Sequence, residues 1–347
     1  MRSRRVLITG GGGFLGTHLA ARFRREGVAV RLFDRARCPD WAHEPGLEYM
    51  GGDVRDPAAV AAALEGIDGV IHAAFASPRE SPAVIRSVNV EGTRNLCAGA
   101  LARGVRRFVS ISSTIVLRPA PAHSLLRSSP LSRVGHYRAS RVEAEGVVAE
   151  WGSRGLSAAI VRPKTFLGPG RVSAFALLFE CIRLGRPVPV LGSGGNRYQL
   201  LDSRDLAEGI RRLECAEPEG LFSFGAREFS TVREDLQALL DHARTGARLR
   251  HIPGWIARAG LRGMELANIV PLAEWHYMSA RGEDSVVDIS RAEKELGWRP
   301  ARSNAQALVE AFDWYVASVT TTGAARGTHP VPLAHRALKG LHWILPR

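Results

Sequence analysis

The chain has 347 residues, more than one hydrophobic core usually supports, so two cooperating lobes are expected. Hydrophobic residues make up 45% of it and charged residues 23%, which excludes wholesale disorder. The formal net charge is +13, but the basic residues are scattered rather than clustered, which argues against nucleic-acid binding. Only Lys164, Lys294 and Lys339 among the 47 basic residues are lysines, a bias that suggests codon composition.

The N-terminus and the cysteines indicate the expected compartment. The opening residues pass from arginines through a short apolar run into glycines, which leaves no room for the apolar region of a signal peptide. No stretch approaches the ~20 apolar residues of a spanning helix. The four cysteines lie far apart without C-x-x-C spacing, so neither a metal site nor a disulfide framework is predicted. A reducing cytoplasm is the expected location.

Apolar runs alternate with helix-like stretches in the first half of the chain. Strands are predicted at 6–9, 28–34, 69–74, 107–112 and 157–163. Amphipathic helices are predicted between them, at 16–26, 57–65, 82–103 and 137–154. Strands separated by helices of this length predict an α/β fold with a doubly wound, Rossmann-type parallel sheet.

After Pro163 the pattern changes, with Gly and Pro clusters and helical stretches at 173–184, 204–214, 230–244 and 304–319. We therefore predict a dinucleotide-binding domain over 1–165, with returning segments near 198–225, and a smaller substrate-binding lobe over 166–319. Residues 320–347 are expected to be a linker and a basic amphipathic tail. The tail segment 333–345 is expected to dock on the protein itself, with peripheral membrane contact as the alternative.

A glycine-rich turn, Thr9 to Gly16, lies between the first predicted strand and the first predicted helix. Gly10 permits a tight turn, Gly13 lets the backbone approach a pyrophosphate, and Gly16 lets the helix pack closely on its strand. Asp34 ends the second strand, where a carboxylate can accept hydrogen bonds from the adenosine ribose. This favours NAD, although Arg35 beside it would suit the 2′-phosphate of NADP.

Further motifs follow in order: GDVRD at 52–56, HAA at 72–74, NVEGT at 89–93, SISSTIV at 110–116, YRASR at 137–141, RPKTFLGPG at 162–170, GSGGNRYQLLDSRDLA at 192–207 and ISRAEKELGWRP at 289–300. Together the chain resembles the extended short-chain dehydrogenase/reductases, specifically the NAD-dependent epimerase/dehydratase family, from about residue 5 to 316. The resemblance implies NAD as cofactor and a homodimer through helices 82–103 and 137–154. Those helices carry apolar residues on more than one face, namely Val88, Leu96, Leu101, Val142 and Val147.

The resemblance also assigns residues to the two ligands. The cofactor is expected to contact Gly10, Gly13, Phe14, Leu15, Gly16, Asp34, Arg35, Asp53, Val54, Ala73, Ala74, Asn89, Tyr137, Arg141 and Pro163. A small-molecule substrate is expected to contact Ser77, Thr114, Lys164, Thr165 and Arg197.

For catalysis, the resemblance makes Tyr137 the acid/base and Ser113 the hydroxyl that orients the substrate oxygen. Four residues after the tyrosine the family has a lysine, and this chain has Arg141. A cation ~4 Å from a phenolate contributes about 4 kcal/mol at an effective dielectric near 20, and Arg supplies that charge as well as Lys. The guanidinium is planar and does not release its proton, so the exchange leaves a working site, an altered one or a pseudoenzyme open. Lys164 is expected to be an exposed loop residue, with replacement of the missing ammonium as the alternative.

Two substrate positions depart from the sugar-modifying members of the family. Arg197 lies one position earlier than the usual pyrophosphate-binding Arg, and Thr165 stands where an Asn is common. The first expectation is an oxidoreductase or epimerase acting on a sugar, in particular a nucleotide-linked one. Dehydration is the least favoured of these reactions because Thr114 and Ile115 replace the usual Asp-Glu pair. The alternatives are oxidoreduction of a steroid-, terpenoid- or polyketide-like alcohol and a cofactor-binding pseudoenzyme.

Overall fold

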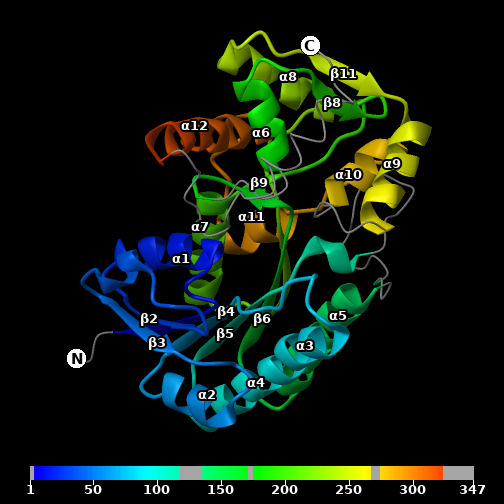
Figure 1. The fold of residues 1–347 in the computed structure, drawn as a ribbon. Helices are drawn as coiled ribbons and strands as arrows, with labels where there is room; N and C mark the ends of the chain where they lie inside the picture. Colours follow the sequence, from blue (N-terminus) through cyan, green and yellow to red (C-terminus); the bar gives the residue numbers. More distant parts are fainter. Residues whose placement is uncertain (1–3, 118–130, 132–134, 171–174, 267–273, 323–347) are drawn as a thin grey trace.

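A computed structural model of the chain describes residues 4–117, 131, 135–170, 175–266 and 274–322. Figure 1 shows a larger lobe built on a central sheet and a smaller lobe above it. None of the described helices is long and apolar enough to cross a membrane.

The larger lobe contains a seven-stranded, entirely parallel sheet, which confirms the predicted Rossmann-type fold. The strand order is β10-β6-β5-β4-β1-β2-β3, so the direction of winding reverses between β1 and β4. In such sheets the crevice at the reversal binds the ligand. The strands are β1 (Arg5–Thr9), β2 (Ala29–Asp34), β3 (Leu47–Gly51), β4 (Gly69–His72), β5 (Arg107–Ile111), β6 (Ala158–Pro163) and β10 (Gly220–Phe224).

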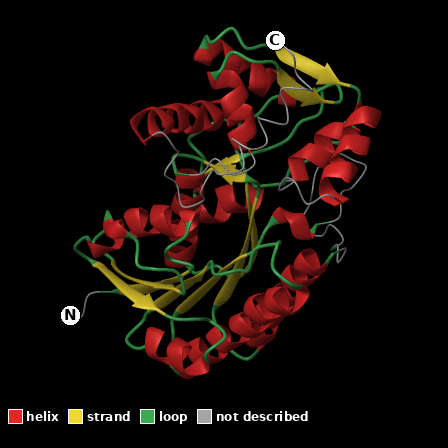
Figure 2. Cartoon of the chain, in the orientation of Figure 1, coloured by secondary structure: helices red, strands yellow, loops and turns green. Residues whose placement is uncertain are grey.

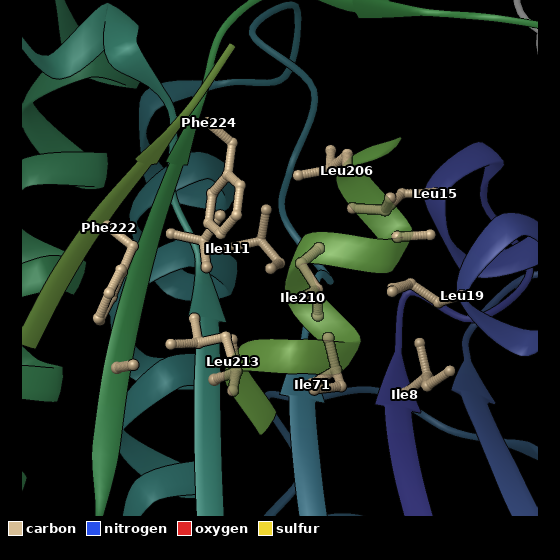
Figure 3. Close-up of a cluster of buried hydrophobic side chains, with 14 of the residues drawn as sticks. Ile8, Leu15, Leu19, Ile71, Ile111, Leu206, Ile210, Leu213, Phe222 and Phe224 are labelled. Atoms are coloured by element: carbon tan, nitrogen blue, oxygen red, sulfur yellow. The ribbon is translucent and has the colours of Figure 1, made fainter. Parts of the chain in front are cut away.

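Helices cover both faces of this sheet (Figure 2). Because both faces are covered, central strands carry runs of buried apolar residues, such as Val6, Leu7 and Ile8 of β1. One face packs against α1 (Phe14–Arg24), α7 (Ser203–Ala216) and α11 (Ser290–Leu296). Figure 3 shows the core there, where Leu15, Leu206 and Ile210 lie over strand residues such as Ile8 and Ile111. The other face packs against α2 (Pro57–Ala63), α3 (Pro82–Arg86), α4 (Gly92–Ala102) and α5 (His136–Ser153).

The predicted helix at 82–103 consists of α3, a π-helical turn at Ser87–Glu91 and α4. Four of the five apolar residues that suggested a dimer face are buried in this chain's own core. They therefore offer no apolar surface to a second copy, and the homodimer stays a prediction. The four are Val88, Leu96, Val142 and Val147.

The smaller lobe has its own apolar core, formed mainly by α6 (Ala176–Arg183), α8 (Val232–Ala243) and α12 (Asn304–Thr322). Two parallel pairs of short strands complete it, β8 (Val188–Leu191) with β11 (Leu249–Ile252), and β7 (Phe166–Leu167) with β9 (Leu201–Asp202). Helices α9 (Gly254–Leu266) and α10 (Glu274–Arg281) pack against each other at its edge. Helix α12 includes 320–322, the start of the predicted linker, and the tail 333–345 lies outside the described residues.

Candidate functional site

The glycine-rich turn joins β1 directly to α1, as predicted. Gly10 has a φ of +67°, and a Cβ there would lie 2.7 Å from the Ala73 carbonyl oxygen. A Cβ on Gly16 would lie 2.3 Å from the Gly11 carbonyl oxygen, so only glycine lets α1 start this close to its strand. The turn therefore has the backbone shape that a pyrophosphate requires, at the N-terminus of α1. Phe14 and Leu15 form the first turn of that helix, and both are buried.

Asp34 ends β2 with its carboxylate held against the glycine turn. One oxygen accepts from the Gly12 amide at 3.0 Å, and the other accepts from the Ala36 amide at 3.0 Å. Both bonds leave lone pairs on the carboxylate for further donors. This is the position at which a ribose diol would be recognised.

We expect Asp34→Ala to weaken NAD binding about 10–100-fold, because hydrogen bonds to a charged group contribute ~1.5–3 kcal/mol. Titration of the protein's tryptophan fluorescence with NAD measures the change. Asp40→Ala, an exposed carboxylate in the same loop region, is the matched control and should bind NAD like the wild type. A clear preference for NADP in the wild type would contradict the assignment of Asp34.

The other residues expected near the adenosine lie around the ends of β2 and β3. Arg35 is exposed, with its guanidinium 3.8 Å from Glu80. Asp53 accepts from the side chain and the amide of Arg55, and the hydrogen bond from the Arg55 side chain lowers the pKa of this carboxyl. Val54 is buried, and its carbonyl accepts from Asn95 of α4. These residues therefore follow the ends of two neighbouring strands, β2 and β3.

The loop after β4, which contains Ala73 and Ala74, is fixed by a buried histidine. Thr93 donates to the Asn89 carbonyl, so its hydroxyl accepts from His72 Nε2 at 2.9 Å. The Nδ1 atom of His72 then accepts from Thr9 at 2.8 Å. Burial, with a smaller contribution from the charge of Arg141, lowers the pKa of His72 to about 3. His72 is therefore a neutral structural group at any physiological pH.

Asn89 ties the same loop to α5 from the π-helical turn. Its side-chain oxygen accepts from the Ala76 amide at 2.8 Å, and its nitrogen donates to Ser140 Oγ at 2.9 Å. Because both ends of this buried amide are used by the protein, Asn89 positions the loop. Direct contact of Asn89 with a cofactor stays a prediction.

Arg141 lies on α5, one turn after Tyr137, with 4% of its surface exposed. Its Nη2 donates to the Ile111 carbonyl at 2.6 Å, and its guanidinium carbon lies 3.4 Å from the centroid of the Phe75 ring. The Nε and Nη1 atoms are buried and have no hydrogen-bond partner among the described residues. Burial lowers the pKa of Arg141, yet a guanidinium keeps its proton at physiological pH. The site therefore contains a fixed cation with two donors that have no partner in the described part of the chain.

No carboxylate of the described residues forms an ion pair with Arg141. Glu145, the buried acidic residue four positions after Arg141 on α5, is bound on both oxygens by the buried Arg162, at 2.9 and 2.5 Å. This part of the structure therefore has two buried guanidinium groups, Arg141 and Arg162, and one buried carboxylate, which binds Arg162. The positive charge of this buried pair of guanidinium groups thus exceeds the negative charge of Glu145.

Tyr137 and Ser113 come from elements that pack together. Ser113 follows β5, and its hydroxyl accepts from the Ile115 amide at 3.2 Å at the start of the short 3-10 helix Thr114–Val116. That helix contacts α5, whose first turn contains the half-buried Tyr137. The Ile111 carbonyl that binds Arg141 lies two residues before Ser113. The three predicted catalytic residues therefore converge at the ends of β5 and α5.

The expectation of an exposed Lys164 is wrong, because only 1% of its surface is exposed. Its ammonium donates to Ser285 Oγ at 2.6 Å and lies 4.3 Å from the centroid of the Tyr198 ring. Both partners belong to the smaller lobe, so Lys164 connects the end of β6 to that lobe. Pro163, beside it, is buried and ends β6.

The other substrate candidates lie at varied depths. Thr165 Oγ1 is 2.8 Å from the hydroxyl of Tyr198, and Tyr198 is buried. Arg197 is half exposed and binds Asp284 through its amide at 2.7 Å, its Nε at 3.0 Å and its Nη2 at 2.9 Å. Ser77 is exposed, and Thr114 is buried.

Two features of the site were not predicted from the sequence. Phe75 directly follows the HAA motif, but no spacing links it to Arg141 far along the chain. Glu145 lies four residues after Arg141, a spacing that places both on one helix face and could have indicated it. Among the described residues, no group of His, Cys, Asp and Glu has the arrangement of a metal site.

The model of the NAD dependent epimerase/dehydratase family matches residues 6–217, more than half of the chain. The glycine turn, Asp34 and the convergence of Ser113, Tyr137 and Arg141 lie within that span. The chain belongs to this family.

Similar proteins were found both by sequence and among solved structures. The uncharacterized protein y4nG of Sinorhizobium fredii is 34% identical over 98% of this chain and 86% of its own length. A 3-beta-hydroxysteroid dehydrogenase of Mycolicibacterium neoaurum is 29% identical over 95% of this chain and 96% of its own length. Among solved structures, the UDP-glucose 4-epimerase of Thermus thermophilus in complex with NAD has a TM-score of 0.71 at 22% identity. That match covers 91% of this chain and 100% of the epimerase chain, and it shows the shared fold.

Proposed function

We propose that this chain is an NAD-dependent oxidoreductase that interconverts a secondary alcohol and a ketone on a hydrophobic small molecule. The observation that carries the choice of substrate is the pairing of Arg197 with Asp284. The guanidinium expected to bind a pyrophosphate holds a neighbouring carboxylate instead, and the next position is the buried Tyr198. Similarity to a 3-beta-hydroxysteroid dehydrogenase over nearly the full length supports the same choice.

The residues present fit NAD. The turn from Gly10 to Gly16 has a close-packed backbone in which a Cβ on Gly10 or Gly16 would collide with a carbonyl oxygen, and it would hold the pyrophosphate. Asp34 would accept from the adenosine ribose. The Nε and Nη1 atoms of Arg141, which have no hydrogen-bond partner among the residues that the structure describes, would donate to the nicotinamide ribose. Direct contacts of Arg35, Asp53, Val54 and Pro163 with the cofactor stay predictions.

NAD held by these residues would supply the acceptor for a hydride from the carbinol carbon of the alcohol. Tyr137 accepts the hydroxyl proton on its oxygen, so that the substrate leaves as a ketone and the proton stays on the enzyme. Ser113 holds the substrate oxygen beside Tyr137 by a hydrogen bond. In the reverse direction Tyr137 returns the proton to the carbonyl oxygen.

Arg141 keeps the Tyr137 oxygen able to take that proton. A cation in a buried site stabilises a negative charge on the phenol oxygen, and this cation has no carboxylate of its own, among the described residues, to neutralise it. Contact with the Phe75 face and the Ile111 carbonyl holds the guanidinium in one place. Arg141 thereby supplies the charge that a lysine supplies in other members of the family.

The substrate class is tested by mixing purified protein and NAD with a 3β-hydroxysteroid and, separately, with UDP-glucose. We expect the absorbance of reduced nicotinamide to rise with the steroid alcohol. Arg197→Ala serves as the discriminating variant. It should leave KM for the steroid within about twofold, because Arg197 contacts Asp284 rather than an apolar substrate.

Two outcomes would contradict the proposal. Turnover of UDP-glucose alone, with KM raised in Arg197→Ala, would return the protein to the nucleotide-sugar chemistry first expected from the sequence. Tight NAD binding without redox change on a wider panel of alcohols would identify a pseudoenzyme. The cytoplasmic location and the homodimer stay predictions.

A further inference from the structure

Helix α9 presents two large apolar side chains to solvent at its first turn. Trp255 is 68% exposed and Ile256 is 43% exposed. The opposite side of α9 is buried through Ala257 and Leu261, which pack with Ala280, Leu191 and Ile252. The helix is therefore fixed to the smaller lobe by a narrow stripe, and Trp255 and Ile256 lie away from that stripe.

The same outer face is basic. Arg258 and Arg262 follow Trp255 at helical spacings of three and seven residues, so all three side chains lie on one face of α9. Trp255, Ile256, Arg258 and Arg262 are called the α9 face below. The whole segment 242–264 contains no Asp or Glu, whereas it contains five arginines, and all five are exposed: Arg244, Arg248, Arg250, Arg258 and Arg262. None of the five forms an ion pair with another described residue.

We propose that the α9 face docks on an anionic lipid bilayer. An exposed tryptophan and isoleucine flanked by arginines that form no ion pair with a described residue match a surface whose headgroups are negative and whose interior is apolar. Charge complementarity decides between occupants. A second copy of α9 or the basic tail, with Arg336, Lys339 and Arg347, would bring like charges together.

Helix α9 is connected through hydrogen bonds to segments of the candidate site, so docking would also bring that site close to the lipid. Figure 1 shows α9 and α10 at the edge of the smaller lobe away from α12. The amide of Gly192 donates to the Ile252 carbonyl of β11, two residues before α9, and the segment from Gly192 leads to Arg197 and Tyr198. Arg258 donates to Ala280 of α10, and the chain continues to Asp284 and Ser285.

One of these two segments contains Arg197 and Tyr198, and the other contains Asp284 and Ser285. Each segment contacts Lys164, and each is therefore anchored on α9 or its neighbours. Docking would place this wall of the site beside the lipid, where a hydrophobic alcohol accumulates. The docking itself does not depend on the proposed function.

The test is co-sedimentation of the full chain with two kinds of vesicle, phosphatidylcholine alone and phosphatidylcholine mixed with phosphatidylglycerol. No NAD or substrate is present, so the result is independent of the proposed activity. We expect binding to the anionic vesicles only, with Ile256→Ser and Trp255→Ser each weakening it about tenfold.

Matched controls separate the α9 face from general effects. Leu184, at the end of α6, is exposed to the same 43% as Ile256, and Leu184→Ser should bind like the wild type. The double variant Arg250→Ser/Arg262→Ser should lose binding, whereas Arg25→Ser/Arg103→Ser removes the same charge from two exposed sites and should retain it. Thermal melting confirms that each variant is folded.

Three results would overturn the proposal. The first is failure of the wild type to bind anionic vesicles. The second is wild-type binding by the Trp255 and Ile256 variants, which would assign the binding to another segment, such as the tail. The third is a change from dimer to monomer in those variants by light scattering, which would assign the α9 face to a second copy.

Discussion

Tyr137→Phe is expected to lower the turnover number by about 10²-fold to 10⁴-fold, which is the contribution typical of general acid–base catalysis. The substitution removes only the hydroxyl, and the ring packing against the core around α5 is unchanged. NAD affinity should stay within about threefold, because the charge of Arg141, the glycine turn and Asp34 are untouched. Stopped-flow or steady-state absorbance of reduced nicotinamide measures the turnover.

Tyr315→Phe is the control for loss of a tyrosine hydroxyl elsewhere. Tyr315 donates to Glu180 at 2.8 Å in the core of the smaller lobe, far along the chain from α5. We expect this variant to be less stable but to turn over substrate like the wild type. Undiminished turnover in Tyr137→Phe would show that another group transfers the proton.

The ligand-binding end of the sheet could be predicted because local pattern encodes it. A glycine turn between a strand and a helix, followed by Asp34 at the end of the next strand, has one structural solution. The strands of the large sheet that were missed are β3 and β10, at its two edges. Every residue of β3 is at least partly exposed, and β10 lies in a Gly- and Pro-rich stretch. Neither strand therefore has the long apolar run of a central strand.

The contacts that hold the site residues in place could not be predicted, because they join residues that are distant in sequence. Phe75 meets Arg141, and Lys164 meets Ser285, with no motif that links the members of either pair. Lys164 also shows how a general rule fails. Lysines in loops are usually exposed, but an ammonium can be buried when a hydroxyl and an aromatic face receive it. Its place after β6 was predicted correctly, but its depth was not.

The second large expected effect is on turnover when Arg141, the cation on α5 one turn after Tyr137, is replaced. Arg141→Met should lower turnover about 10²-fold or more, because it removes the positive charge of α5 beside Tyr137 while it keeps the length and apolar contacts of the side chain. Arg141→Lys should keep turnover within about tenfold of the wild type. A lysine ammonium can donate to the Ile111 carbonyl and face the Phe75 ring, as the guanidinium does.

The difference between the two Arg141 variants, rather than either rate alone, tests the role of charge. Both leave a space where the guanidinium was, so both incur similar packing losses, and only Arg141→Met also loses the cation. Arg154→Lys and Arg154→Met, at the exposed end of α5, are the matched controls and should turn over substrate like the wild type. Equal activity of Arg141→Lys and Arg141→Met would show that Arg141 acts only in packing. A strong gain in Arg141→Lys over an inactive wild type would instead mean that the native arginine had silenced the site.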